Sequence, residues 1–344
     1  MIDIATPPDY RAEAELAEPR KRLEPVLDLL RCPATRQPLL IDQNTLVTSD
    51  RGYAYRISET GLPLFAENAC SPDAETQRFH YDRIAANYIA HLQYPHTIEY
   101  AAYLDRALLQ VVGAPKHGTI GEICCGRGEA LQLVGGRAVR AVGIDISRNM
   151  LEAALTDYAA HPNIAFVQGD ATRLPLADDI FDEVFILGGI HHVNDRHALF
   201  SEVFRVLKPG GKFFFREPCS DFVLWRALRA VIYRLSPELD HATERPLIEA
   251  ETVPVLQAVG FEIRSYERHG FLGFCLLMNS DVLIFNRAFR FIPGIRRLTR
   301  LAADFDEWAL HRQLMRRVGL QVVGCALKPD LAAGDGKSAP EGPA

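Results

Sequence analysis

The sequence lacks several features that would decide its class at once. No apolar run approaches the roughly 18 residues of a membrane-spanning helix, and residues 1–22 have no apolar core of the kind found in secretory signals. Seven cysteines among 344 residues, two of them adjacent, do not form a disulfide framework and favour a reducing, cytoplasmic setting. With 38 Lys and Arg against 44 Asp and Glu, the net charge is −6, which argues against nucleic-acid binding over the whole surface.

What is present is ordinary globular composition, 48% hydrophobic and 24% charged. The length allows about two domains. Both ends are polar or rich in small residues and proline, and we expect them to be flexible tails. The predicted parts are a tail (1–24), a small α+β module (25–70), a main domain (71–273 and 318–328), a helical insertion before the last strand (274–317) and a second tail (329–344).

The main domain alternates strand-length apolar runs with helical stretches. The runs are TIGEICC, AVGID, IAFVQGD, EVFILGG and KFFFREP. Such alternation predicts βαβ units, with a parallel sheet covered by helices on both faces. The predicted fold class is therefore α/β, Rossmann-like and doubly wound.

The turn after the first of these strands predicts a nucleoside site. Glycines at 126 and 128 allow a sharp turn and a close approach of the backbone to a ligand. Asp145 ends the next strand, where an acidic side chain can accept both ribose hydroxyls. Leu131 replaces the third glycine of the dinucleotide fingerprint, which disfavours NAD. Glu122 would repel a pyrophosphate but suits a ligand with an ammonium group, and the alternative is a tight turn without a ligand.

Together, GEICCGRG, VGIDIS, VQGDATRLPLADDIFDEVF, HHVND and RVLKPGGKFFF resemble the motifs of class I S-adenosylmethionine-dependent methyltransferases of the ubiquinone and menaquinone biosynthesis type, over about residues 79–265. The resemblance implies a seven-stranded sheet and S-adenosylmethionine as cofactor. The family usually has glycine where this chain has Cys124, yet we expect binding to survive. The implied contacts are Glu122, Cys124, Gly126 and Gly128 for the methionine part, Asp145 for the ribose, Ile146 and Met150 for the adenine, Asp170 and Ala171 for its amino edge, and Leu187 near the methyl group.

Candidates for catalysis lie on a preceding helix and at the carboxyl edge of the sheet. Tyr81 and Tyr88 are two helical turns apart and can face one pocket, or both can be core aromatics. Their hydroxyls are candidate partners of the cofactor carboxylate. A base would remove a proton from an oxygen or acidic carbon acceptor. The candidate bases are His191, His192, Glu217 and His241, of which His192 and Glu217 follow strands that end at this edge.

The N-terminal module, LLRCPATRQPLL…GYAYRISETGLPLF, resembles the zinc-ribbon-like activator of tRNA and protein methyltransferases. Cys32–Pro33, Pro38–Leu39 and the segment 61–63 carry the match. Zinc-binding versions have a second cysteine two or three residues after the first, where this chain has Ala34 and Thr35. Four zinc ligands cannot be assembled, so we expect no metal and a scaffold or lid-supporting role.

Segment 274–317 contains eight arginines against four acidic residues, and residues 222–235 form a helix with a wide apolar face. Three roles remain open: a roof packed over the site, a lid for a hydrophobic acceptor, or direct contact with an anionic membrane. The sequence therefore predicts a methyltransferase for a hydrophobic small molecule or lipid-like acceptor, such as a quinone, polyketide or terpenoid. The alternatives are an RNA methyltransferase and a catalytically silent partner subunit.

Overall fold

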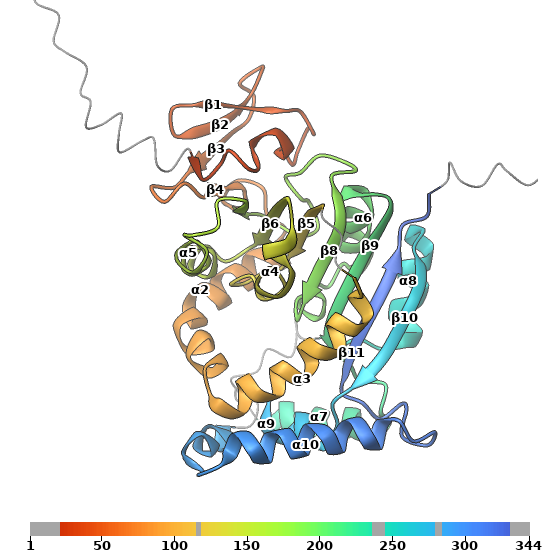
Figure 1. Cartoon of the computed structure of the whole chain (residues 1–344). Coiled ribbons are helices and arrows are strands. Elements are labelled where there is room, and N and C mark those ends of the chain that lie inside the picture. The colour runs from red at the N-terminus through yellow and green to blue at the C-terminus, as the bar shows by residue number, and fades with distance from the viewer. Residues whose placement is uncertain (1–20, 115–117, 236–244, 279–283, 331–344) are drawn as a thin grey trace, which may run out of the picture.

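A single mixed sheet runs through the molecule in the computed structural model, which describes residues 21–114, 118–235, 245–278 and 284–330. Eleven strands of the described chain make up this sheet: β1 (Leu39–Asp42), β2 (Thr45–Thr48), β3 (Ala54–Ile57), β4 (Pro63–Leu64), β5 (Thr119–Ile123), β6 (Arg140–Asp145), β7 (Ile164–Gln168), β8 (Phe181–Leu187), β9 (Leu207–Pro218), β10 (Glu262–His269) and β11 (Gln321–Leu327). Their order across the sheet is β1-β2-β3-β4-β7-β6-β5-β8-β9-β11-β10 (Figure 1).

The seven strands from β5 to β11 form the predicted doubly wound sheet. Strands β5 to β9 are parallel to one another, and β11 and β10 follow as antiparallel strands. Every residue of β7 is buried, as expected of a parallel strand covered on both faces. The predicted α/β fold class is confirmed.

Helices cover both faces of this sheet. The described helices are α2 (Pro72–Leu92), α3 (Pro95–Val112), α4 (Glu129–Val134), α5 (Arg148–Asp157), α6 (Arg196–Val206), α7 (Val223–Leu235), α8 (Glu249–Val259), α9 (Leu272–Leu277) and α10 (Ile295–Leu310), with five short 3₁₀ segments at 27–29, 65–67, 135–137, 190–192 and 284–291. Helices α3, α4 and α5 bury apolar side chains against one face of the sheet. Helices α6 and α8 share a second apolar cluster with the opposite face.

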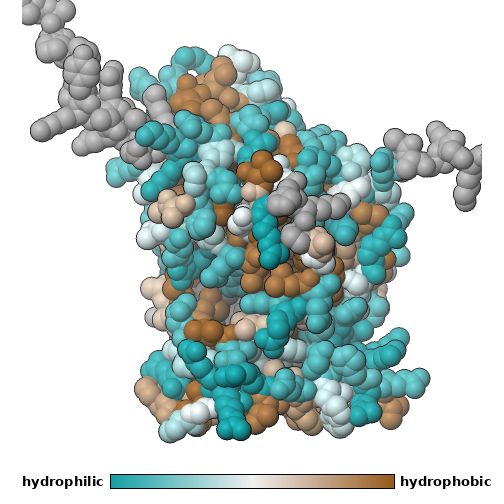
Figure 2. All heavy atoms as spheres, in the orientation of Figure 1, coloured by the Kyte–Doolittle hydropathy of each residue, from teal (hydrophilic) through white to brown (hydrophobic). Residues whose placement is uncertain are grey.

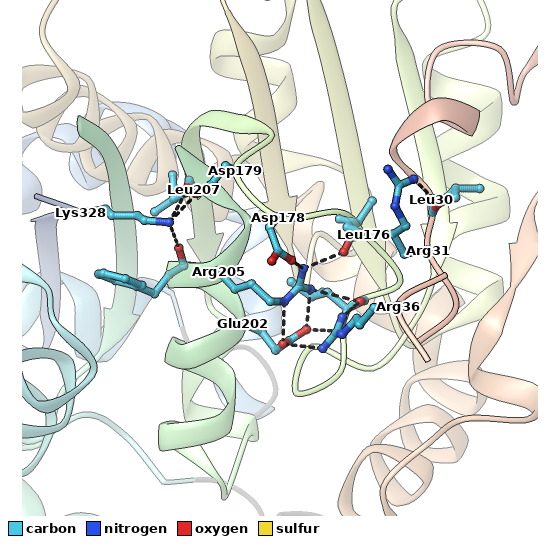
Figure 3. Close-up of polar contacts among 12 residues, drawn as sticks. Leu30, Arg31, Arg36, Leu176, Asp178, Asp179, Glu202, Arg205, Leu207 and Lys328 are labelled. Atoms are coloured by element: carbon cyan, nitrogen blue, oxygen red, sulfur yellow. Dashed lines mark hydrogen bonds and ion pairs between the residues drawn. The ribbon is translucent and has the colours of Figure 1, made fainter. Parts of the chain in front are cut away.

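The N-terminal strands are part of the same sheet. Strands β1 to β4 form an antiparallel meander, and Leu64 of β4 pairs in parallel with Gln168 of β7. An ion-pair network adds a second connection: Arg36 bonds Glu202 of α6 at 2.8 Å and the Leu174 carbonyl at 2.7 Å (Figure 3). The sequence predicted the module but not that its strands continue the main sheet.

A layer of helices lies at the opposite end of the molecule from the module, at the bottom of Figure 1. Helix α10 packs against α3 and α9 around a third apolar cluster that includes Tyr100 and Phe274. Asp306 of α10 is fully buried and accepts hydrogen bonds from the Tyr100 hydroxyl at 2.6 Å and the Phe271 amide at 2.8 Å. Among the described helices, none is long and apolar enough to cross a bilayer.

Candidate functional site

A cavity of about 450 Å³ lies at the carboxyl ends of β5, β6, β7 and β8. This is the edge at which open α/β sheets bind ligands, and the volume lies within the range of small-molecule sites. Helix α2 supplies the remaining wall. The lining residues are Ser71–Ala74, Gln77, Tyr81, Leu92, Cys124–Arg127, Glu129, Ile144–Ile146, Met150, Gly169–Thr172, Leu187–Gly189 and His192–Asp195.

The turn after β5 is tight and shaped for close approach. Cys124 and Gly126 both have left-handed backbone conformations, with φ of 54° and 51°. The Gly126 N–H donates to Asp145 Oδ2 at 2.8 Å. A Cβ on Gly126 would come within 3.2 Å of Met150 Cε, so a side chain at position 126 would narrow the cavity.

Asp145 ends β6 and faces this turn. Its second oxygen, Oδ1, accepts from the Ser147 N–H at 2.8 Å. Burial raises the pKa of the carboxyl, while the Ser147 and Gly126 amides act in the opposite direction. Each carboxylate oxygen has a further lone pair, so Asp145 can still accept the two hydroxyls of a ribose.

The residues that the sequence predicts to contact the adenine also border the cavity. Ile146, Met150, Asp170 and Ala171 all line it. Asp170 is held by local donors, because its Oδ1 accepts from the Thr172 amide and hydroxyl and its Oδ2 accepts from the Ser71 amide at 2.8 Å. Ser71 is the N-cap of α2, so the start of α2 is fixed to the loop that follows β7.

Gln77 on α2 is a lining residue that the sequence reasoning missed. Its side chain is buried, and Oε1 has no hydrogen-bond partner within the described chain. A buried amide oxygen without a partner is costly, and a ligand in the cavity can supply the missing donor. Gln77 lies four residues before Tyr81 and therefore on the same helical face, which could have identified it as a lining residue.

Tyr81 and His192 form a direct pair in the cavity. The Tyr81 hydroxyl lies 2.7 Å from His192 Nε2. Burial, followed by the neighbouring His191 ring, lowers the pKa of His192 well below its ordinary value, so this ring is neutral near pH 7. Of the other candidates, the Tyr88 side chain and all of His241 lie outside the described residues.

Glu217 does not line the cavity. It is fully buried, and its Oε1 accepts from the amides of Gly189 and Ile190 at 2.7 and 2.8 Å. Its Oε2 lies 2.8 Å from His191 Nδ1. Burial raises the pKa of Glu217 to about 7 against the lowering effect of these amides. The predicted base is instead placed to hold the 3₁₀ turn that carries His192.

Glu122 and Gly128, which the sequence predicted as contacts of the methionine part of the cofactor, have partners within the protein instead. The buried Glu122 carboxylate accepts from the amides of Ala130 and Leu131, both at 2.9 Å. It therefore caps the first turn of α4, with each carboxylate oxygen bonded to one backbone amide. Gly128, with φ of 84°, begins the same helix and accepts from the Tyr158 hydroxyl at 2.5 Å. Neither residue is among those that line the cavity.

A roof over the site was one of the three roles left open for the insertion, and the described residues of 274–317 do not form the wall of the cavity. No lining residue comes from the described parts of 274–317, and α2 covers the cavity instead. The reason is that α10 packs on α3 and α9, on the far side of α3.

In the N-terminal module, Cys32 is buried and its Sγ lies 3.2 Å from the Tyr55 hydroxyl. The described residues contain no group of three or more His, Cys, Asp or Glu side chains gathered as metal ligands. The absence of a metal therefore stays a prediction from the sequence.

Comparison with known proteins identifies the central part of the chain. Residues 121–215 match the model of the methyltransferase domain, and residues 24–59 match that of Trm112p-like proteins. The chain thus contains a segment that matches the methyltransferase domain, preceded by a segment that matches Trm112p-like proteins. The matched segment contains the turn after β5, Asp145, Asp170 and His192.

Relatives of this methyltransferase domain include demethylmenaquinone methyltransferases. That of Bacillus licheniformis is 31% identical over 144 residues, 40% of this chain and 62% of the relative. That of Staphylococcus aureus is 38% identical over 109 residues, 31% of this chain and 45% of the relative. The matches thus span about half to three-fifths of these relatives.

Among solved structures, the [4+2]-cyclase SpnF is similar with a TM-score of 0.52 and 17% identity, covering 75% of this chain and 97% of the cyclase. At this identity the likeness concerns the fold alone, and a shared fold does not by itself specify a reaction.

The cofactor of the methyltransferase domain is S-adenosylmethionine, and the cavity residues fit it. Asp145 has acceptor capacity for the ribose, and the turn at Cys124–Gly126 allows a close backbone approach. The unpartnered Gln77 Oε1 requires a donor, which the ammonium group can supply.

Proposed function

We propose that this protein is an S-adenosylmethionine-dependent methyltransferase whose acceptor is a hydrophobic small molecule of the quinone or lipid-like class. The observation that carries the proposal is the cavity of about 450 Å³ in which Asp145, the tight turn after β5 and the Tyr81–His192 pair meet. When bound, S-adenosylmethionine supplies an electrophilic methyl group on sulfur.

In this proposal, Asp145 binds the ribose hydroxyls and Ile146 and Met150 pack against the adenine. Leu187 borders the reacting end of the cavity, next to the Gly188–Gly189 turn. The protein contributes mainly by orienting the two reactants and excluding water from the cavity.

His192 is the proposed base. Its ring is neutral near pH 7 because burial lowers its pKa, so Nε2 can take a proton that reaches it directly or through the Tyr81 hydroxyl at 2.7 Å. Since the lowered pKa keeps the ring neutral below pH 6.5, methyl transfer should persist in mildly acidic solution. Glu217 and His191 act as positioning residues for His192.

The acceptor class is inferred from the wall of the cavity and from the relatives. Leu92 and Val193 add apolar lining beyond the residues assigned to the cofactor, and Leu187 is apolar as well. The demethylmenaquinone methyltransferases among the relatives are consistent with a quinone-like acceptor.

We further propose that residues 25–70 act as a scaffold within the chain. Arg36 bonds the Leu174 carbonyl in the loop that starts at Asp170, and Ser71, just after the module, donates to Asp170. The module would thereby order the adenine side of the cavity.

Cofactor binding is tested by calorimetric titration of S-adenosylmethionine into the wild type and Asp145→Ala. Loss of charge-assisted hydrogen bonds worth about 1.5–3 kcal/mol should weaken binding roughly ten- to a hundred-fold. Asp304→Ala, an exposed change on α10, is the matched control and should bind normally. Equal, tight binding by Asp145→Ala would exclude the assigned site.

Methyl transfer is tested with S-adenosylmethionine labelled in the methyl group and separated lipid, RNA and protein fractions as acceptors. We expect label in the lipid fraction, reduced in His192→Ala while cofactor binding is retained. Label in RNA would favour the RNA methyltransferase alternative. Tight cofactor binding without transfer to any fraction would favour the silent partner subunit.

A further inference from the structure

An unpartnered apolar stripe runs along the outer side of α10. Leu298, Leu301, Phe305 and Trp308 follow one another at helical spacings of three, four and three residues, so they share one face. All four are exposed, whereas Thr299, Ala303 and Asp306 of the same helix are buried. Just before the helix, Phe291 and Ile292 are also exposed, Phe291 by 73%. We call these six residues the α10 stripe.

Arginines outnumber carboxylates around the stripe. Residues 284–317 contain eight arginines and three carboxylates, and one of those carboxylates, Asp306, is fully buried. Arg296 and Arg297, on the first turn of α10, are exposed and have no acidic partner among the described residues. Arg312 lies over the Trp308 ring, 4.7 Å from its centroid. In Figure 2 hydrophobic and hydrophilic residues alternate over this end of the molecule.

We propose that the α10 stripe docks on an anionic lipid bilayer. A helix with Leu, Phe and Trp on one face and arginines beside it has the composition of helices that lie in the membrane interface. The apolar side chains would enter the boundary between headgroups and acyl chains, and Arg296 and Arg297 would meet lipid phosphates.

A second copy of this chain fits the stripe less well. A two-fold contact would place the same surface against itself, so that two segments with eight arginines against three carboxylates each would face one another. An anionic bilayer offers the complementary charge.

The segment that carries Phe291 contacts the chain just after α2, the helix that lines the cavity. Leu92 lines the cavity, and two residues further on the Tyr94 hydroxyl accepts from Arg290 at 2.9 Å, next to Phe291. If the proposed function holds, a lipid-like acceptor would thus have a short route from bilayer to cavity. Membrane docking itself does not depend on the transferase reaction.

The test is co-flotation of the full-length protein with vesicles of phosphatidylcholine, with and without phosphatidylglycerol. We expect binding to the anionic vesicles, weaker at high salt because the charges are screened. Leu301→Asp should lower this binding roughly ten-fold or more, since it removes an apolar group and adds a like charge to the lipid. Leu40→Asp on β1 is the matched control, because Leu40 and Leu301 are each 59% exposed.

The charge contribution is tested with Arg296→Glu combined with Arg297→Glu. This pair should reduce binding to anionic vesicles roughly ten-fold or more, whereas Arg51→Glu combined with Arg264→Glu, with the same change in net charge, should not. Failure of the wild type to bind, equal binding to uncharged vesicles, or no difference between stripe and control variants would overturn the proposal. So would a dimer in sedimentation that Leu301→Asp dissociates, since that result assigns the stripe to a subunit interface.

Cofactor titration on the same variants separates this proposal from the proposed function. Stripe variants should bind S-adenosylmethionine as the wild type does. Vesicle binding without methyl transfer would support the docking surface and contradict only the proposed transferase function.

Discussion

Cys124 and Gly189 lie against each other in two turns that border the cavity. A Cβ built on Gly189 would collide with the Cβ of Cys124 and lie 3.0 Å from its Sγ. Cys124 itself has a left-handed backbone, with φ of 54°, which costs a residue with a Cβ roughly 1–2 kcal/mol. The departure of this chain from the family's usual glycine is therefore accommodated by a glycine in the facing turn.

We predict that Gly189→Ala destabilises the protein in the wild-type background and is better tolerated together with Cys124→Gly. Cys124→Gly removes both atoms of Cys124 with which the new methyl group would collide. Ile186 Cγ2, at 3.0 Å, must still move slightly. The expected coupling is about 1–3 kcal/mol in the free energy of unfolding by urea. Strictly additive effects of the two changes would contradict this packing.

The position of some residues around the cavity could be predicted from the sequence, and that of others could not. Asp145 and Gly126 were predictable because the end of a strand and the turn after it fix where their groups lie. Glu122 was not, because its partners are the amides of Ala130 and Leu131, and their direction depends on how α4 sits on the sheet. Gln77 was missed because nothing local says that α2 covers the cavity.

At the scale of elements, one buried carboxylate connects three helices. Asp306 of α10 accepts from the Tyr100 hydroxyl of α3, and from the amides of Phe271, Gly273 and Phe274 at the start of α9. The amides at a helix start have no partner within their own helix, and a carboxylate near them is favourable. Asp306 thus caps α9 from a neighbouring helix.

We predict that Asp306→Ala lowers the free energy of unfolding by about 3 kcal/mol or more, because several buried donors would lose their acceptor at once. Urea unfolding measures the effect. Asp304→Ala on the exposed side of the same helix is the control and should change stability by no more than about 0.5 kcal/mol. If both variants lowered the free energy of unfolding to a similar extent, the effect would come from any change in helix α10 and not from loss of the cap on α9.

The helical insertion illustrates what an element's pattern can and cannot predict. Its arginine-rich, apolar composition was visible in the sequence, and α10 occurs within it. The place of the insertion could not be predicted in the same way. Helix α2 covers the cavity, and α10 of the insertion packs on α3. The choice between these positions depends on tertiary contacts such as that of Tyr100 with Asp306, which join residues about 200 positions apart.

At the scale of the whole molecule, the N-terminal module is joined to the main domain by strand pairing, an apolar cluster and ion pairs. Residues Leu30, Tyr55 and Phe65 of the module share an apolar cluster with Leu174, Leu176 and Phe200. Glu202 accepts from Arg36 on one side and from Arg205 of its own helix on the other (Figure 3). The sequence predicted the alternating strands of the main sheet, but the pairing of Leu64 with Gln168 follows from no local pattern.

We predict that Arg36→Met weakens both stability and cofactor binding. It removes hydrogen bonds to Glu202 and to the Leu174 carbonyl, for an expected loss of about 1–2 kcal/mol in the free energy of unfolding. Since Leu174 belongs to the loop that begins at Asp170, S-adenosylmethionine should also bind several-fold more weakly by calorimetry. Arg51→Met, which removes an exposed ion pair with Asp42 in the same module, should affect neither quantity appreciably. Normal cofactor binding by Arg36→Met would contradict the scaffold role.

The long-range attachment of the module has a consequence for how the chain reaches its native state. The module is synthesised before the residues that it contacts. Arg36 and Glu202 are 166 residues apart, and Leu64 can pair only after Gln168 has been made. Contacts of such separation form slowly, because the intervening chain must be ordered first. During synthesis the apolar surface around Leu30 and Phe65 therefore stays partly uncovered until Leu174, Leu176 and finally Phe200 of α6 have emerged.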